Sequence, residues 1–151
     1  MIAERLASME YAMANRNLAV GLGGTCVVIL TFVLLFLNPV TFPGFNPWLF
    51  QLTLVVVVLA MFLYTFTGTL YFTLAAMRAI DDPRAVSFYR WGYVCFILGN
   101  VLLTLEPGLI LVTANLWWAG GIALGLWAAF LLLLLETWRV WNTFPRSVPR
   151  F

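Results

Sequence analysis

The sequence predicts an all-α, polytopic membrane protein with four transmembrane helices. Hydrophobic residues make up 64% of its 151 residues and charged residues only 9%, whereas an ordinary soluble domain has about 25% charged residues. Four long apolar segments alternate with short polar connections, and about 20 apolar residues are enough to cross a bilayer. This composition excludes a soluble enzyme, a disordered chain and a nucleic-acid-binding module. We therefore expect the lipid bilayer as a partner, and no nucleic acid.

Residues 1–16 are predicted to form a short amphipathic helix that lies in the membrane interface. Four apolar residues recur there at helical spacing: Ile2, Leu6, Met9 and Met13. Most of the polar residues of this segment fall off that stripe, as in helices that lie flat on a bilayer. The remaining residues, 17–151, are expected to form one four-helix transmembrane domain that ends in a short tail at 138–151.

The predicted spans cover residues 18–37, 48–77, 87–110 and 117–137. The first span carries no charge and is too long for the apolar core of a secretory signal. Three prolines and a glycine between residues 38 and 47 break the helix after it. The second span is near 45 Å long at about 1.5 Å per residue, so it must tilt or project from the bilayer.

The third and fourth spans are bounded by turn signals. Asp81-Asp82-Pro83 is a plausible turn and helix start before the third span. Glu106-Pro107-Gly108 leaves the outer end of that span undefined between residues 105 and 111. The fourth span starts at Trp117 and is followed by a tail rich in arginine and proline.

Arginine supplies all the positive charge and fixes the predicted orientation. The arginines precede the first span, separate the second from the third, and follow the fourth: Arg5, Arg16, Arg78, Arg84, Arg90, Arg139, Arg146 and Arg150. Because positive residues favour the cytoplasmic side, both termini are expected in the cytoplasm. The expected location is the plasma or inner membrane of a prokaryote, with an organelle inner membrane as the alternative.

Small residues form strips along which another helix can approach closely. These strips are Gly121, Gly125 and Ala129 in the fourth span, Gly21 and Gly24 in the first, and Gly92 and Gly99 in the third. They are expected either to pack the four helices together or to form an interface between subunits. Association with further copies or with other membrane subunits is expected, because four helices enclose little interior.

Glu106 is the one ionisable residue outside the arginine-bearing side. A carboxylate facing hydrocarbon is costly, so its side chain should face protein, water or headgroups. Pro107 cannot donate a backbone hydrogen bond, which frees a carbonyl near the same level. Glu106 is therefore either a group at a pore mouth that attracts a cation or binds a proton, or a helix-end residue in a wet interface.

Polar residues within the second and third spans suggest a pathway. Asn100 and Thr104 lie one turn apart in the third span, and the second span carries a threonine stripe with a glutamine further out: Thr65, Thr69, Thr73 and Gln51. If the two sets faced each other, they would form a continuous polar seam. The alternatives are an interhelical hydrogen bond for the asparagine and bonds from the threonine hydroxyls to their own helix.

The sequence contains no recognisable catalytic or metal-binding constellation. Histidine is absent, and Cys26 and Cys95 are predicted to be buried thiols in separate apolar segments. We therefore expect no enzymatic activity, no metal and no cofactor. The predicted function is a homo-oligomeric ion channel or small transporter, and the alternative is a non-catalytic accessory subunit of a larger membrane complex.

Overall fold

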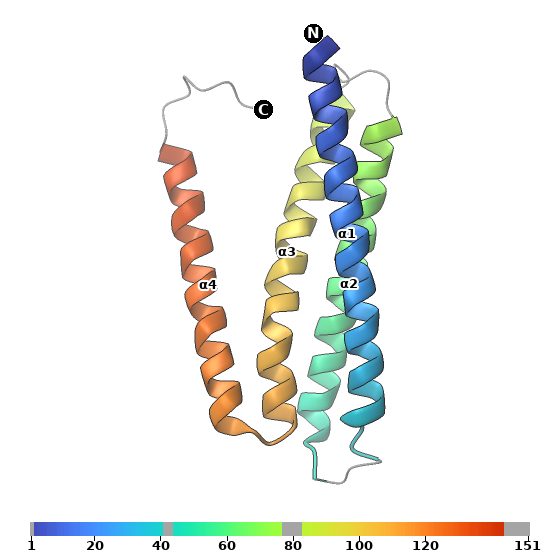
Figure 1. Cartoon of the computed structure of the whole chain (residues 1–151). Coiled ribbons are helices and arrows are strands. Elements are labelled where there is room, and N and C mark those ends of the chain that lie inside the picture. The colour runs from blue at the N-terminus through green and yellow to red at the C-terminus, as the bar shows by residue number, and fades with distance from the viewer. Residues whose placement is uncertain (1, 41–43, 77–82, 144–151) are drawn as a thin grey trace.

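The computed structural model describes residues 2–40, 44–76 and 83–143. This part of the chain consists of four long helices: α1 (Ile2–Phe36), α2 (Pro47–Ala76), α3 (Pro83–Thr113) and α4 (Trp117–Thr143). Each contains a stretch that is long and apolar enough to cross a membrane. The start of α1 and the end of α4 lie at the same end of the molecule (Figure 1). The prediction of an all-α protein with four apolar helices is therefore confirmed.

The first helix differs from the expected separate interfacial helix. α1 runs without a break through residue 16 and on to Phe36. No proline or glycine precedes Gly21, so nothing in the backbone favours a bend there. Extending an existing helix also costs less than nucleating a second one. Residues 2–16 therefore belong to the same continuous helix as the first candidate span.

The α1–α2 and α3–α4 connections, at the end of the molecule opposite the start of α1, are fixed by polar caps (Figure 1). The Asn46 side-chain oxygen accepts hydrogen bonds from the N–H groups of Trp48 (3.0 Å) and Leu49 (3.4 Å), so it caps the start of α2. Asn115, with φ of 61°, ends α3 in the left-handed conformation. Its side chain also donates to the Gly44 carbonyl, which ties the α1–α2 and α3–α4 connections together.

The turn after α3 explains why α4 folds back so sharply. The N–H of Asn115 donates to the Val112 carbonyl (3.0 Å), and the N–H of Leu116 donates to the Leu111 carbonyl (2.9 Å). This pair of bonds is the Schellman arrangement that ends helices at a left-handed residue. α3 and α4 therefore form a tight helical hairpin.

Buried positions recur with a seven-residue period. They are Ala12, Ala19, Cys26 and Val33 on α1, and Ala85, Gly92, Gly99, Glu106 and Thr113 on α3. On α2 they alternate in steps of four and three: Thr53, Val57, Ala60, Tyr64, Thr67 and Tyr71. An average spacing of 3.5 residues is that of left-handed helix packing. α1, α2 and α3 form a three-helix bundle in which α2 packs against both neighbours.

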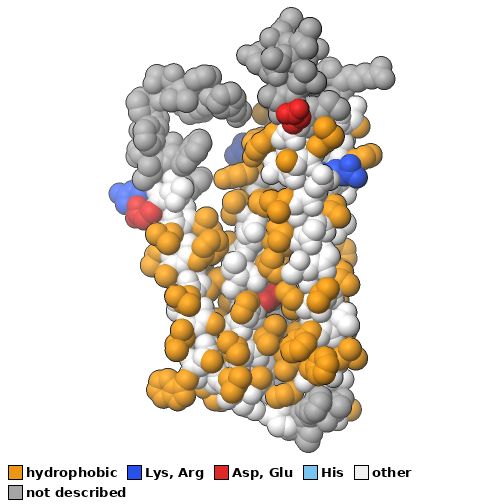
Figure 2. All heavy atoms as spheres, viewed as in Figure 1, with side chains coloured by type: hydrophobic (Ala, Val, Ile, Leu, Met, Phe, Trp, Pro, Cys, Tyr) orange, Lys and Arg blue, Asp and Glu red, His pale blue; other side chains and the backbone are white. Residues whose placement is uncertain are grey.

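The fourth helix contacts only α3 within the described helices. The two helices diverge towards the end that holds the start of α1 (Figure 1). In the apolar stretch of α4, only 6% of the residues are buried, compared with 28% in that of α2. Hydrophobic side chains cover most of the visible face of the molecule, and charged side chains gather mainly near that same end (Figure 2). One face of α4 is therefore left without a neighbour among the residues that the structure describes.

The predicted small-residue strips are used unequally. Gly92 and Gly99 lie against the rings of Tyr71 and Tyr64, respectively. The other predicted glycines have no atom within 4 Å of the position that a Cβ would take: Gly21, Gly24, Gly121 and Gly125. Ala129 is exposed. The strips of α1 and α4 therefore have no helix packed closely against them in the described part of the chain.

Two other glycines make the close contact between α3 and α4. A Cβ at Gly108 would lie 2.7 Å from a Leu124 methyl carbon, and one at Gly120 would lie 2.4 Å from a Val112 methyl carbon. Further along the hairpin, the Trp127 indole donates to the Val101 carbonyl (2.9 Å). The hairpin is thus held at its closed end by glycine and at mid-helix by an interhelical hydrogen bond.

Candidate functional site

Glu106 is fully buried in the protein interior. Its relative exposure is 0%, and neither of its carboxyl oxygens has a hydrogen-bond partner among the residues that the structure describes. Burying a carboxylate without partners is costly, so such residues inside membrane domains are candidates for function. The structure places this side chain inside the bundle and not at a wet helix end.

The packing of α3 on α2 sets the depth of Glu106. Glu106 lies two helical turns, or about 10 Å, from Thr113 at the end of α3. The Thr113 hydroxyl lies 3.2 Å from the Thr53 hydroxyl of α2, and both are fully buried. The buried Thr53–Thr113 pair therefore lies between the level of Glu106 and the end of α3.

Tyr64 brings a second unpartnered polar group into the same interior. Its hydroxyl is buried and has no hydrogen-bond partner in the described part of the chain. Its ring is fixed by Gly99, where a Cβ would lie 3.0 Å away, and by an edge contact with Phe96 at 6.1 Å between ring centroids. Tyr64 packs with Cys26 of α1 in one buried cluster. Fully buried polar or thiol groups are thus contributed by α1, α2 and α3.

Pro107 adds a backbone oxygen to this region. α3 continues through the proline to Thr113, three residues beyond the predicted end of the third span at residue 110. Because proline has no N–H, the Leu103 carbonyl loses its ordinary intrahelical donor. That carbonyl lies about one turn from Glu106 on the same helix.

The donor set around Glu106 fits a proton better than a metal cation. Within residues 2–40, 44–76 and 83–143, no group of three or more His, Cys, Asp or Glu side chains is placed to hold a metal ion. Calcium and magnesium take six or more oxygen ligands, whereas Glu106 supplies a single carboxyl group. A single carboxyl group is sufficient to bind and release a proton.

Buried polar residues continue along the contact between α2 and α3. We call them the α2–α3 polar seam: Thr53, Thr113, Glu106, Tyr64, Thr67 and Tyr71. The Thr67 hydroxyl donates to the Gly92 carbonyl across the interface (3.4 Å). Tyr71 in turn makes an edge contact with Tyr89, at 6.3 Å between centroids. Polar groups therefore follow most of the length of the interface.

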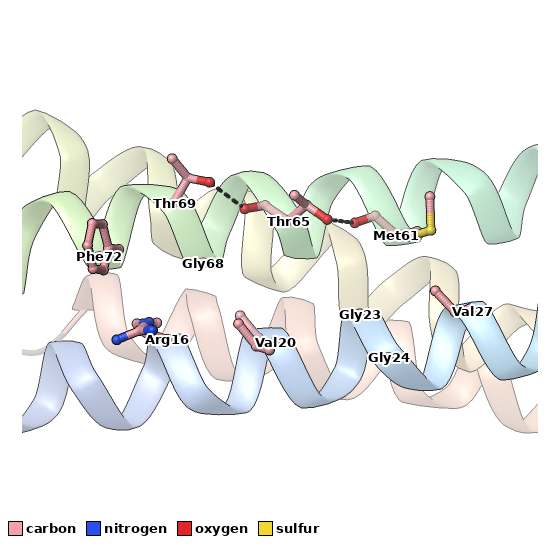
Figure 3. A pocket seen from close by; sticks show the side chains of 11 residues that line it. Arg16, Val20, Gly23, Gly24, Val27, Met61, Thr65, Gly68, Thr69 and Phe72 are labelled. Carbon is pink, nitrogen blue, oxygen red and sulfur yellow. Dashed lines mark hydrogen bonds between the residues drawn. The ribbon is translucent and has the colours of Figure 1, made fainter.

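The predicted threonine stripe lies on a different surface. The hydroxyls of Thr65, Thr69 and Thr73 each donate to the carbonyl four residues earlier in α2, at 2.9 Å. Thr65 and Thr69 are exposed and line a groove between α2 and α1 (Figure 3). The stripe therefore faces the groove and α1.

The other predicted pathway residues also bond within their own helix or face outwards. The Asn100 side chain donates to the Phe96 carbonyl (2.8 Å), and the Thr104 hydroxyl donates to the Asn100 carbonyl (2.8 Å). Thr104 and Gln51 are exposed. Of the predicted pathway residues, only Glu106 lies in the α2–α3 polar seam.

Thr53, Tyr64 and Thr67 were not among the predicted site residues, although the sequence carries a signal for the α2–α3 polar seam. On α3, buried residues follow one another at intervals of seven, and these intervals select Glu106 and Thr113 but not Asn100 or Thr104. A seven-residue period in the sequence of α3 indicates the face that packs on α2. Strips of small residues four apart do not. Both cysteines are free and buried, as predicted.

Tyr64→Phe tests whether the Tyr64 hydroxyl has no partner. Its removal is expected not to lower the free energy of unfolding, because no hydrogen bond is lost. Tyr64→Ala is expected to lower it by about 3–5 kcal/mol, because the packed ring is lost as well. Unfolding in detergent micelles measures both changes. A loss of about 1 kcal/mol or more in Tyr64→Phe would show that the hydroxyl is bonded.

Comparison with known proteins identifies no relative from which a function could be transferred. No family model, no curated protein and no solved structure matches this chain. Two features therefore carry the argument: the buried groups around Glu106 and the unpacked face of α4.

Proposed function

We propose that the protein is a homo-oligomeric ion channel or small transporter whose ion is the proton, with Glu106 as the proton-binding group. The observation that carries this proposal is a fully buried carboxyl group without a hydrogen-bond partner among the described residues. A buried carboxyl group is neutral with its proton and charged without it. Gain or loss of the proton therefore changes the free energy of the surrounding bundle strongly.

The α2–α3 polar seam supplies groups that can relay the proton. Hydroxyl groups both donate and accept hydrogen bonds, and the seam has them on both sides of Glu106 along the interface. The threonine pair Thr53 and Thr113 lies towards the α1–α2 and α3–α4 connections, and Thr67 lies towards the opposite end. Under this proposal, a small separation of α2 and α3 would admit water between these hydroxyls.

The proposed oligomer forms through α4. Its strip of Gly121, Gly125 and Ala129 is open, and small residues allow a second helix to approach closely in lipid. Gly125→Cys is expected to form a disulfide between two copies under mild oxidation. Leu126→Cys, exposed on the adjacent part of the helix surface, is the matched control and should cross-link much less. Equal cross-linking at both positions would contradict this interface.

Flux measurements test the proposed activity. The purified protein in liposomes, under an imposed pH gradient, is expected to acidify or alkalinise the lumen faster than protein-free liposomes do. A pH-sensitive dye inside the liposomes reports the rate. If flux stayed at the protein-free level while the protein remained folded, proton transport would be excluded.

A second candidate is an accessory subunit of a larger membrane complex. It is favoured by the same unpartnered face of α4, which a different membrane protein could cover. Stoichiometric co-purification with other subunits, loss of stability without them and no flux in liposomes would support this function. A stable homo-oligomer with flux would exclude it.

A further inference from the structure

A groove of about 470 Å³ runs between α1 and α2 on the surface of the three-helix bundle (Figure 3). On α1 it extends from Arg16 to Val27, and on α2 from Met61 to Phe72. Several of its residues, including Val20 and Thr65, are exposed. The groove is therefore open to whatever surrounds the helices.

The length of the groove matches one leaflet of a bilayer. It covers eleven residue steps on each helix, which correspond to about 16 Å at about 1.5 Å per residue. The hydrocarbon core of a bilayer is about 30 Å thick, so one leaflet contributes about half of that. A single acyl chain lying along the helices would occupy the groove from end to end.

The floor of the groove is apolar and lacks bulk. Gly23, Gly24 and Gly68 contribute no side chain to it. At Gly24, nothing lies within 4 Å of the position that a Cβ would take. The hydroxyl protons of Thr65 and Thr69 are already donated to carbonyls of their own helix. These surfaces suit a hydrocarbon chain better than a polar ligand.

One end of the groove carries a positive charge. The Arg16 guanidinium lies 5.0 Å from the centre of the Phe72 ring (Figure 3), which holds it at the groove mouth. Among the described residues, no acidic side chain forms an ion pair with Arg16. Guanidinium groups bind phosphate through paired hydrogen bonds. The apolar groove therefore ends at a site for an anionic headgroup.

We infer that this groove binds an anionic phospholipid from the leaflet on the side where α1 begins, with an acyl chain along the groove and the phosphate on Arg16. The helix face of a second copy would fill an apolar groove as well, but it would gain nothing from the arginine. This inference depends on the helices crossing a bilayer and is independent of proton transport.

Lipid selectivity tests the headgroup contact. The protein is reconstituted in phosphatidylcholine vesicles that contain spin-labelled phosphatidylglycerol or spin-labelled phosphatidylcholine. Wild type is expected to immobilise the phosphatidylglycerol label preferentially. Arg16→Gln should reduce that preference about fivefold, which corresponds to about 1 kcal/mol per arginine near anionic lipid. No preference in wild type, or an equal preference in the variant, would overturn the inference.

Filling the groove tests the chain contact. Gly24→Leu should lower the immobilised fraction of the phosphatidylglycerol label, because the new side chain occupies the groove. Gly21→Leu is the matched control, since it is equally free of clashes but lies outside the groove. Equal effects of the two variants would overturn the inference. So would a loss of oligomeric mass in Gly24→Leu alone, because it would show that a second copy fills the groove.

Discussion

Glu106→Gln is expected to reduce proton flux through liposomes to the level of protein-free vesicles while the helical fold is kept. Glutamine has nearly the shape of glutamate but cannot bind and release a proton at ordinary pH. Because Glu106 is fully buried, no surface carboxyl group would take its place. Glu106→Asp keeps the carboxyl group and should retain part of the flux. The measurement is the initial rate of change of a dye inside the vesicles.

Glu136→Gln is the matched control for this experiment. Glu136 is exposed near the end of α4, 3.8 Å from the exposed Arg139 guanidinium, and surface pairs of this kind contribute little to stability. Its substitution should leave the flux unchanged. Full flux in Glu106→Gln, or equal losses in the two glutamine variants, would show that Glu106 does not carry the proton.

Gly120→Leu is expected to open the hairpin between α3 and α4. A Cβ at Gly120 would lie 2.4 Å from a Val112 methyl carbon and 3.0 Å from the Val112 backbone nitrogen. Overpacking of this kind costs about 1–3 kcal/mol or more, and leucine adds further atoms at the same point. Thermal unfolding in detergent micelles should therefore occur at a clearly lower temperature than in wild type.

The neighbouring glycine provides the control for the hairpin. Gly121 has nothing within 4 Å of its Cβ position, so Gly121→Leu should unfold close to the wild-type temperature. If the two leucine variants unfolded at the same temperature, the close approach at Gly120 would be contradicted.

The arrangement of the helices was largely predictable because it follows from local chemistry. α2 begins at Pro47 and ends at Ala76, one residue from each predicted bound, because Asn46 and the proline-rich connection define its start. Proline alone was a poor guide in α3, which continues past Pro107. The amphipathic pattern of residues 1–16 also could not show whether α1 bends. The same periodicity is expected in one continuous helix and in two helices joined by a bend.

The site could be predicted only in part, because the direction in which each side chain points depends on how the helices contact one another. Glu106 stood out as an isolated ionisable residue, but its depth depends on where α3 ends. Gly120 and Gly121 are adjacent in sequence, yet a rotation of about 100° per residue sends one towards α3 and the other away from it. For the same reason, Thr65 and Thr69 of α2 line the groove with α1, while the Tyr64 ring packs against Gly99 of α3.

Infrared spectroscopy of the reconstituted protein can follow the Glu106 carboxyl group itself as the pH is cycled. If Glu106 takes up and releases a proton inside the bundle, a carboxyl band will rise and fall reversibly with pH. That band will be missing in Glu106→Gln and intact in Glu136→Gln. A pH-dependent spectrum that is the same in wild type and Glu106→Gln would contradict proton binding at this residue.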